Sequence, residues 1–165
     1  MQAVIVYLAL GSNLGDRRAN LAAALARLRE GVTVDAISSL YETEPAYVTE
    51  QPRFLNAVLR GRTTIGPDEL LAFVKEIERA QGRVAGPRFG PRLVDIDLLL
   101  YGDTALTTPE LTIPHPRMAE RPFVLVPLAE IAPDLIPPGW SESVDARASA
   151  VRGHGDVLAV AGRLD

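Results

Sequence analysis

Two aspartates, Asp95 and Asp97, lie within the otherwise apolar stretch "RLVDIDLLLYGD". An ionised carboxylate is costly to bury unless a cation or dense hydrogen bonding compensates its charge. Positions i and i+2 of a strand face the same way, with Cα atoms roughly 6.6 Å apart. Two such carboxylates can bind one or two Mg²⁺ ions, and paired metals in phosphoryl-transfer sites lie about 3.5–4 Å apart. The pattern therefore predicts a metal site, and the alternative is a solvent-facing strand edge.

The segment that precedes this strand is rich in arginine and glycine. Residues 82–92 contain three glycines, two prolines, no acidic residue and three arginines, which are Arg83, Arg88 and Arg92. Fixed positive charges beside a Mg²⁺ site suit the binding of a polyphosphate. A mixture of glycine and proline is typical of a lid over an active site. The alternative is a solvated surface loop.

The chain lacks the usual glycine-rich phosphate motifs. It contains neither G-x-x-x-x-G-K-[ST] nor G-x-G-x-x-G, and "GSNLGDR" has no lysine and is interpreted as a turn from strand to helix. A nucleotide must therefore be bound by side chains and metal. His115, held between two prolines in "TIPHPRM", and Arg121 are candidate phosphate ligands. For His115, a purely structural role in the loop is equally consistent with the sequence.

Strands and helices interleave along the chain. Apolar runs predict strands at residues 3–10, 32–42, 54–64 and 93–101. Helices are predicted from the N-cap Asp16 to Gly31, from Pro67 to Gly82, and over residues 142–151. Between Gly102 and Pro138 the chain is rich in proline, which indicates loops and short helices. The interleaving predicts an α/β sandwich with a mixed or antiparallel sheet.

Composition narrows the class of protein. The 165 residues predict one domain, and 47% apolar with 23% charged residues is typical of a soluble globular chain. A net charge of −4 argues against nucleic acid as the main partner. The absence of cysteine excludes disulfides and thiolate chemistry. The apolar run 3–10 lacks a basic leader and is too short to span a membrane, so we expect a cytoplasmic protein.

These motifs together resemble the 6-hydroxymethyl-7,8-dihydropterin pyrophosphokinase family of folate biosynthesis. The resemblance covers residues 4–136 and is carried by "YLALGSNLGDR", "SSLYETEP", "QPRFLNAV", "GPRLVDIDLLLYGD" and "TIPHPRMAERPFVLVPLAEIAP". It implies a ferredoxin-like α/β sandwich with a central sheet flanked by helices, and a monomer. It also implies transfer of a pyrophosphoryl group from ATP to the hydroxymethyl group of the pterin, with release of AMP.

The resemblance also implies roles for individual residues. Asp95 and Asp97 would hold two Mg²⁺ ions and, with Arg83 and Arg92, form the catalytic set. Contacts with ATP are implied for Glu78, Arg83, Arg88, Arg92, Leu98, Thr112, His115 and Arg121. Contacts with the pterin are implied for Thr43, Pro45, Ala46, Phe54, Asn56, Asp95 and Phe123. In that set Phe54 and Phe123 would sandwich the ring, and Asn56 would read its polar edge.

The chain departs from the family pattern near the nucleotide. Its arginine-rich loop is one residue shorter, and Phe89, Glu110 and Pro116 replace a frequent tryptophan, arginine and tyrosine. These changes bear on ATP contacts and lid closure. Two other functions stay open: a nucleotidyltransferase or phosphohydrolase that uses the same aspartates, and a nucleotide-sensing module without turnover. Release of AMP distinguishes pyrophosphoryl transfer from both.

The arginines of the loop generate a first prediction. If they contact the phosphates chiefly in the transition state, Arg83→Ala and Arg92→Ala lower kcat more than they weaken binding of either substrate. Steady-state kinetics with each substrate varied in turn measures both effects. A raised KM with unchanged kcat would show that the arginines only bind the ground state.

Overall fold

The computed structural model describes residues 2–43, 53–82, 93–151, 157–159 and 162–165. The main sheet contains β1 (Val4–Ser12), β2 (Thr33–Ile37), β3 (Tyr41–Thr43), β4 (Phe54–Thr63), β5 (Asp95–Tyr101) and β8 (Val157–Ala159). A separate pair of short strands is formed by β6 (Leu106–Thr107) and β7 (Thr112–Ile113). The helices are α1 (Arg17–Leu28), α2 (Pro67–Ala80), α3 (Pro122–Ile131), α4 (Val144–Val151) and the 3₁₀ turn η1 (Met118–Glu120).

The strand order identifies the fold class. Apart from β3, which lies between β2 and β4 in the chain, the elements β1, α1, β2, β4, α2 and β5 form a βαββαβ unit. Strands β5, β1, β4 and β2 lie side by side with antiparallel pairing. This is the ferredoxin-like arrangement, so the predicted sandwich with an antiparallel sheet is confirmed. Strand β3 also pairs with β4, and β8 pairs with β3.

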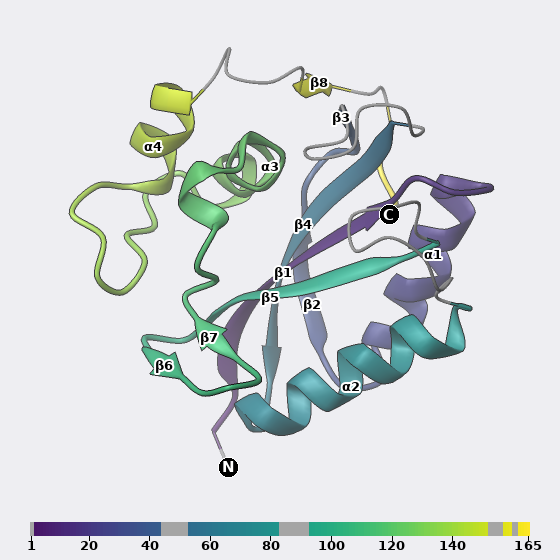
Figure 1. The fold of residues 1–165 in the computed structure, drawn as a ribbon, viewed down its shortest axis with the longest axis horizontal. Coiled ribbons are helices and arrows are strands. Elements are labelled where there is room, and N and C mark those ends of the chain that lie inside the picture. The colour runs from purple at the N-terminus through teal and green to yellow at the C-terminus, as the bar shows by residue number, and fades with distance from the viewer. Residues whose placement is uncertain (1, 44–52, 83–92, 152–156, 160–161) are drawn as a thin grey trace.

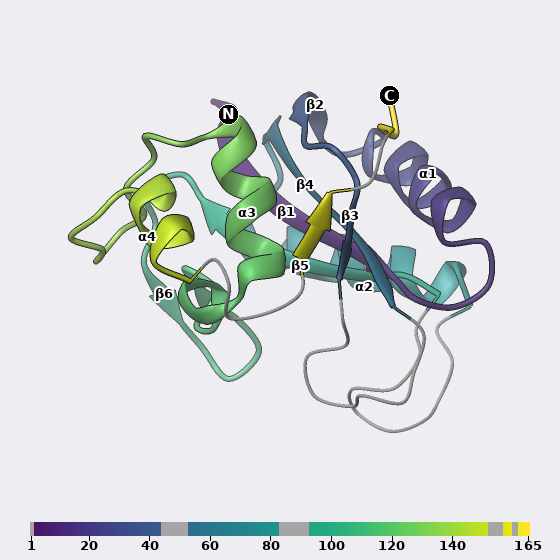
Figure 2. The ribbon, with the colours of Figure 1, turned by 90° about the horizontal axis from the view of Figure 1, so that it is seen from above.

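Helices cover both faces of the sheet, as Figures 1 and 2 show. On one face, α1 and α2 pack with Leu8, Leu10, Ile96 and Leu98 of the sheet in one apolar cluster. On the other face, α3 and α4 pack with Tyr7, Val58 and Leu99 in a second cluster. The central strands β1, β4 and β5 therefore divide most of their side chains between two buried layers, where a polar side chain needs a specific partner.

The helices begin where their sequence signals predict. The Asp16 side chain accepts a hydrogen bond of 3.1 Å from the backbone N–H of Ala19, which caps α1. Pro67 is the first residue of α2, where its missing N–H costs no hydrogen bond, and Asp68 and Glu69 complement the helix dipole.

The prediction of one strand over residues 32–42 is wrong, because the structure divides this segment into β2 and β3. Ser38 lies at the break. Its hydroxyl accepts a 3.0 Å hydrogen bond from the backbone N–H of Val58, where a carbonyl would otherwise stand in the ladder. Strand β8 lies in the tail, for which the sequence predicted no element.

Within the residues described, no helix has the length and apolar character needed to cross a membrane.

Candidate active site

The two aspartates of β5 lie on the sheet face that carries α3. Ile96 and Leu98 are buried in the cluster under α1 and α2, whereas Asp95 and Asp97 are half-buried on the opposite face. The predicted alternation is confirmed for residues 94–98, and it breaks at a bulge after Leu98, where Leu99 and Leu100 both join the second cluster. Gly11 of β1 lies directly opposite Asp95 in the ladder.

A row of paired residues runs from Asp95 across the sheet. Asp95 pairs with Gly11, Gly11 with Asn56 of β4, and Asn56 with Tyr41 of β3. Paired residues share a face, and neighbouring strands lie about 4.8 Å apart, so Asn56 lies two strands from Asp95 at about 10 Å. The register therefore brings the predicted metal ligand and the predicted pterin reader to one surface.

Gly11 is a residue of the site that the sequence reasoning missed. A Cβ at this position would lie 2.8 Å from Oδ1 of Asn56 and 3.6 Å from the ring of Phe54. Glycine therefore lets the amide and the ring lean across β1. Its role depends on Asn56, which is distant in sequence, so the interpretation of "GSNLGDR" as a turn from strand to helix does not reveal it.

The amide of Asn56 is fixed by a buried hydrogen bond. Its Nδ2 donates to Oγ1 of Thr43 at 2.7 Å, and the two side chains are 7% and 3% exposed. Phe54 lies opposite Thr43 and, two residues before Asn56, on the same face. Three predicted pterin contacts are therefore brought together by β3 and β4.

Arg121 and Phe123 approach this face from the beginning of α3. Arg121 is the N-cap residue, and its guanidinium carbon lies 5.5 Å from the centroid of the Phe123 ring, within cation–π distance. Phe123 packs against the cluster that contains Val58, which lies two residues beyond Asn56 on β4. The distant "ERPF" segment thus reaches the face that carries Phe54 and Asn56.

His115 is held next to β5 as a neutral hydrogen-bond donor. Its backbone N–H donates to the carbonyl of Leu99 at 3.0 Å, and its Nδ1 accepts from the backbone N–H of Arg117 at 3.2 Å. The ring proton is therefore on Nε2. Burial, together with the nearby charges of Arg121 and Arg117, lowers the pKa of His115 to about 4, against the opposing effect of Asp95.

Glu78 supports the aspartate strand from α2. Its side chain is 2% exposed, and Oε2 accepts a 2.9 Å hydrogen bond from the backbone N–H of Ile96, on the open edge of β5. Burial, together with the neighbouring Asp95, raises the pKa of Glu78 to about 7, against the opposing effects of the hydrogen bond from Ile96 and of Lys75. A group that titrates near neutrality thus lies directly behind the predicted metal ligands.

Two predicted nucleotide contacts lie close to this region. The Leu98 side chain belongs to the core, so only its backbone remains for a ligand. Thr112 is half-buried on β7, opposite Thr107. The remaining predicted residues lie outside the described part of the chain, and these are Arg83, Arg88, Arg92, Pro45 and Ala46.

Arg17 is a second residue that the sequence reasoning missed. The first residue of α1 donates to the Glu42 carboxylate of β3 at 2.9 Å and to the backbone carbonyl of Arg53 at 3.0 Å. It therefore joins the end of β3 to the residue that precedes Phe54. The "GDR" signal was interpreted only as the beginning of a helix.

The donor set of Asp95 and Asp97 fits Mg²⁺. In the part of the chain that the structure describes, no cluster of three or more histidine, cysteine, aspartate or glutamate side chains could hold a metal. Structural zinc needs four protein ligands, whereas Mg²⁺ commonly binds through one or two carboxylates together with substrate phosphates. Two carboxylates on one face therefore suit a Mg²⁺ ion that arrives with a polyphosphate.

Comparison with curated proteins finds relatives of two lengths. The chain is 51% identical over 127 residues to the pea (Pisum sativum) "Folate synthesis bifunctional protein, mitochondrial", a match that covers 76% of the chain and 25% of the relative. It therefore spans about a quarter of that protein. The chain is 47% identical to the Bacillus subtilis 2-amino-4-hydroxy-6-hydroxymethyldihydropteridine pyrophosphokinase, and the match covers 77% of each.

Solved structures agree on the fold. The crystal structure of wild-type Plasmodium falciparum HPPK-DHPS superposes with a TM-score of 0.74 at 15% identity, over 90% of this chain and 45% of that one. The family model described as 7,8-dihydro-6-hydroxymethylpterin-pyrophosphokinase (HPPK) matches residues 7–133, which include every residue of the site. The chain belongs to the 7,8-dihydro-6-hydroxymethylpterin-pyrophosphokinase family.

Proposed function

We propose that this protein transfers a pyrophosphoryl group from ATP to the hydroxymethyl oxygen of 6-hydroxymethyl-7,8-dihydropterin, with AMP as the second product. The observation that carries the proposal is the row in which Asp95, Gly11 and Asn56 share one face of the sheet. Asp95, the proposed Mg²⁺ ligand, and Asn56, the proposed contact for the polar edge of the pterin, thus lie about two strand spacings apart, or roughly 10 Å. Membership of the family supplies the identity of both substrates.

In this proposal the charged and ionisable side chains have different roles. Asp95 and Asp97 would hold Mg²⁺, with two ions expected. When bound, Mg²⁺ would neutralise phosphate charge. His115 donates from Nε2–H to a phosphate oxygen, and Arg121 offers a fixed positive charge beside it. Because His115 is neutral, its hydrogen bond to a phosphate adds no positive charge to that of Arg121 and Mg²⁺.

The polar and aromatic side chains orient the acceptor. Phe54 and Phe123 stack on the pterin ring, and Asn56 pairs with its polar edge. The hydroxymethyl oxygen then attacks the β-phosphorus in line and loses its proton to water. The bond from that phosphorus to the α–β bridging oxygen breaks, and AMP leaves with that oxygen. Catalysis rests on positioning and charge balance, and no strong general base is assigned.

Product identification tests the proposal, with the aspartates as its matched variants. Incubation of the protein with Mg-ATP and the pterin should release AMP in a 1:1 ratio with the pterin diphosphate. Asp95→Ala and Asp97→Ala should each lower turnover by about three orders of magnitude, because charge stabilisation of this kind is lost with either ligand. Chromatography of the nucleotides measures the ratio.

Other products would contradict the proposal in distinguishable ways. ADP or pyrophosphate as the released product would indicate a phosphohydrolase or a nucleotidyltransferase. Binding without any turnover would indicate a sensing module. Near-normal activity of either aspartate variant would rule out the metal assignment alone. Circular dichroism provides the control that each variant retains the fold.

His115 generates a prediction on pH. Its pKa in the folded protein is about 4, against 6.5 for an unperturbed histidine. Because the pKa is lower in the folded protein than in the unfolded chain, the unfolded chain binds the proton more readily. The contribution of neutral His115 to the free energy of unfolding is therefore fully present above pH 6.5 and is lost as the pH falls from about 6.5 to about 4. NMR titration of a His154→Gln variant, which leaves a single imidazole, should show a midpoint near pH 4 without ligands. A midpoint near 6.5 would contradict the buried, neutral donor.

The pterin contacts generate a further prediction. Phe123→Ala removes a stacked ring, and Asn56→Ala leaves a polar ring edge unpaired, so each should weaken pterin binding by about tenfold or more. Affinity for Mg-ATP should stay within about twofold, since neither side chain faces a phosphate. Separate titrations with the two ligands measure this. Parallel weakening of both ligands would show that the substitutions damage the structure instead.

A further inference from the structure

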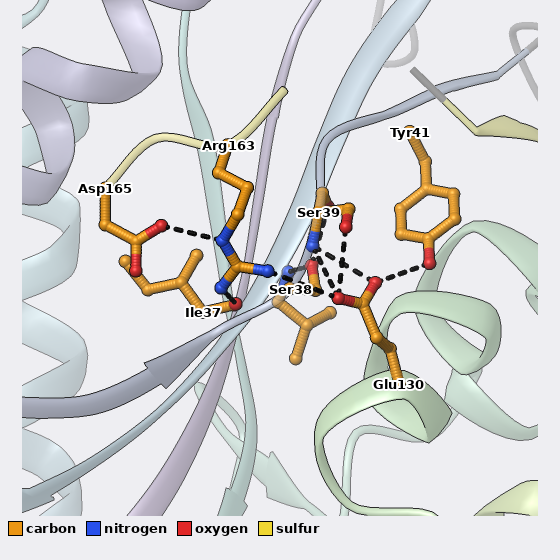
Figure 3. Close-up of polar contacts among 8 residues, drawn as sticks. Ile37, Ser38, Ser39, Tyr41, Glu130, Arg163 and Asp165 are labelled. Carbon is orange, nitrogen blue, oxygen red and sulfur yellow. Dashed lines mark hydrogen bonds and ion pairs between the residues drawn. The ribbon is translucent and has the colours of Figure 1, made fainter. Parts of the chain in front are cut away.

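Glu130, near the end of α3, receives a concentrated set of hydrogen bonds. Its carboxylate accepts from the backbone N–H of Ser39 at 3.0 and 3.1 Å, from the Ser39 hydroxyl at 3.1 Å and from the Tyr41 hydroxyl at 2.5 Å (Figure 3). Arg163 completes the group, with Nη1 at 3.6 Å from Oε2. The Glu130 side chain is 29% exposed, and these donors surround its carboxylate.

This carboxylate joins two elements that carry opposite walls of the proposed pterin site. Phe123 lies seven residues before Glu130 on α3, about 10 Å along the helix axis. Tyr41 pairs with Asn56 in the sheet and lies two residues before Thr43, whose hydroxyl fixes the Asn56 amide. Contacts from Glu130 to β3 therefore restrain the helix that bears Phe123 against the strands that bear Asn56.

The C-terminal tail contacts the same group through Arg163. Arg163 pairs with Glu130 and also donates to the backbone carbonyl of Ile37 and, at 2.9 Å, to Asp165 (Figure 3). Strand β8 pairs with β3 along Tyr41 to Thr43. This tail lies beyond the part of the chain that the family model matches. A segment outside the family match thus holds the strand that leads into the site.

We propose that Glu130 is a positioning residue for the pterin: it sets the spacing between Phe123 and Asn56, with Arg163 and the Tyr41 hydroxyl as its supports. The inference rests on the proposed function, because it names what Glu130 does for that substrate. Glu130 itself touches neither substrate in this proposal. Its effect should therefore appear in pterin affinity and not in the chemistry at the phosphates.

Substitutions of graded severity test the inference. Glu130→Ala should raise the pterin KM about tenfold, because small misplacements of binding groups are costly, while kcat and the KM for Mg-ATP stay within about twofold. Glu130→Gln keeps an acceptor but loses the charge, and Tyr41→Phe loses one hydroxyl, so each should raise the pterin KM about threefold. Asp35→Ala is the matched control, since it breaks the Asp35–Arg62 carboxylate–arginine pair between β2 and β4.

A double-mutant cycle separates positioning from general support. If Glu130 acts through the Asn56 amide, adding Glu130→Ala to Asn56→Ala should raise the pterin KM by less than about twofold more. A full tenfold effect in that background would overturn the inference, and so would equal losses for pterin and ATP. Unchanged pterin affinity in Glu130→Gln and Tyr41→Phe would overturn it as well.

The outcomes also separate this inference from the proposed function. A wild-type protein that neither binds nor converts the pterin would overturn both. A wild-type protein that forms AMP, with Glu130 variants that match the Asp35→Ala control, would overturn the positioning role alone. Thermal unfolding of every variant, followed by circular dichroism, sets an assay temperature at which each protein is folded.

Discussion

The alternation of side chains along β5 is the constraint on which the site depends. Ile96 and Leu98 must be buried under α1 and α2, and this places Asp95 and Asp97 on the other face. A shift of one residue in the pairing of β5 with β1 would bury both carboxylates in an apolar cluster and expose the leucine and isoleucine. The hydrophobic core therefore fixes where the charges lie. The site follows from the same register that stabilises the fold.

Burial shifts the protonation of two ionisable groups close to β5. Burial raises the pKa of Glu78 to about 7 and lowers that of His115 to about 4, so both groups tend towards the neutral form near neutral pH. Among the described residues on this face, Asp95 and Asp97 are the proposed Mg²⁺ ligands and Arg121 is a proposed phosphate contact.

Local signals in the sequence predicted much of this arrangement. The spacing of Asp95 and Asp97 predicted their shared face, and Asp16 and Pro67 marked the beginnings of two helices, because these features depend only on neighbours in the chain. Phe54 and Asn56 likewise share a face because they are two residues apart on one strand. The roles of Gly11 and Glu130 could not be predicted in this way. Each depends on residues distant in sequence, and only strand order and helix packing bring them together.

The central claim is that one sheet face gathers the metal ligands and the pterin contacts. A crystal structure with Mg²⁺, the pterin and an ATP analogue whose α–β bridge is a methylene group tests it most directly. We expect Mg²⁺ at Asp95 and Asp97, and the pterin ring between Phe54 and Phe123 with its polar edge at Asn56. A pterin bound on the face covered by α1 and α2, or Mg²⁺ bound away from both aspartates, would contradict the claim.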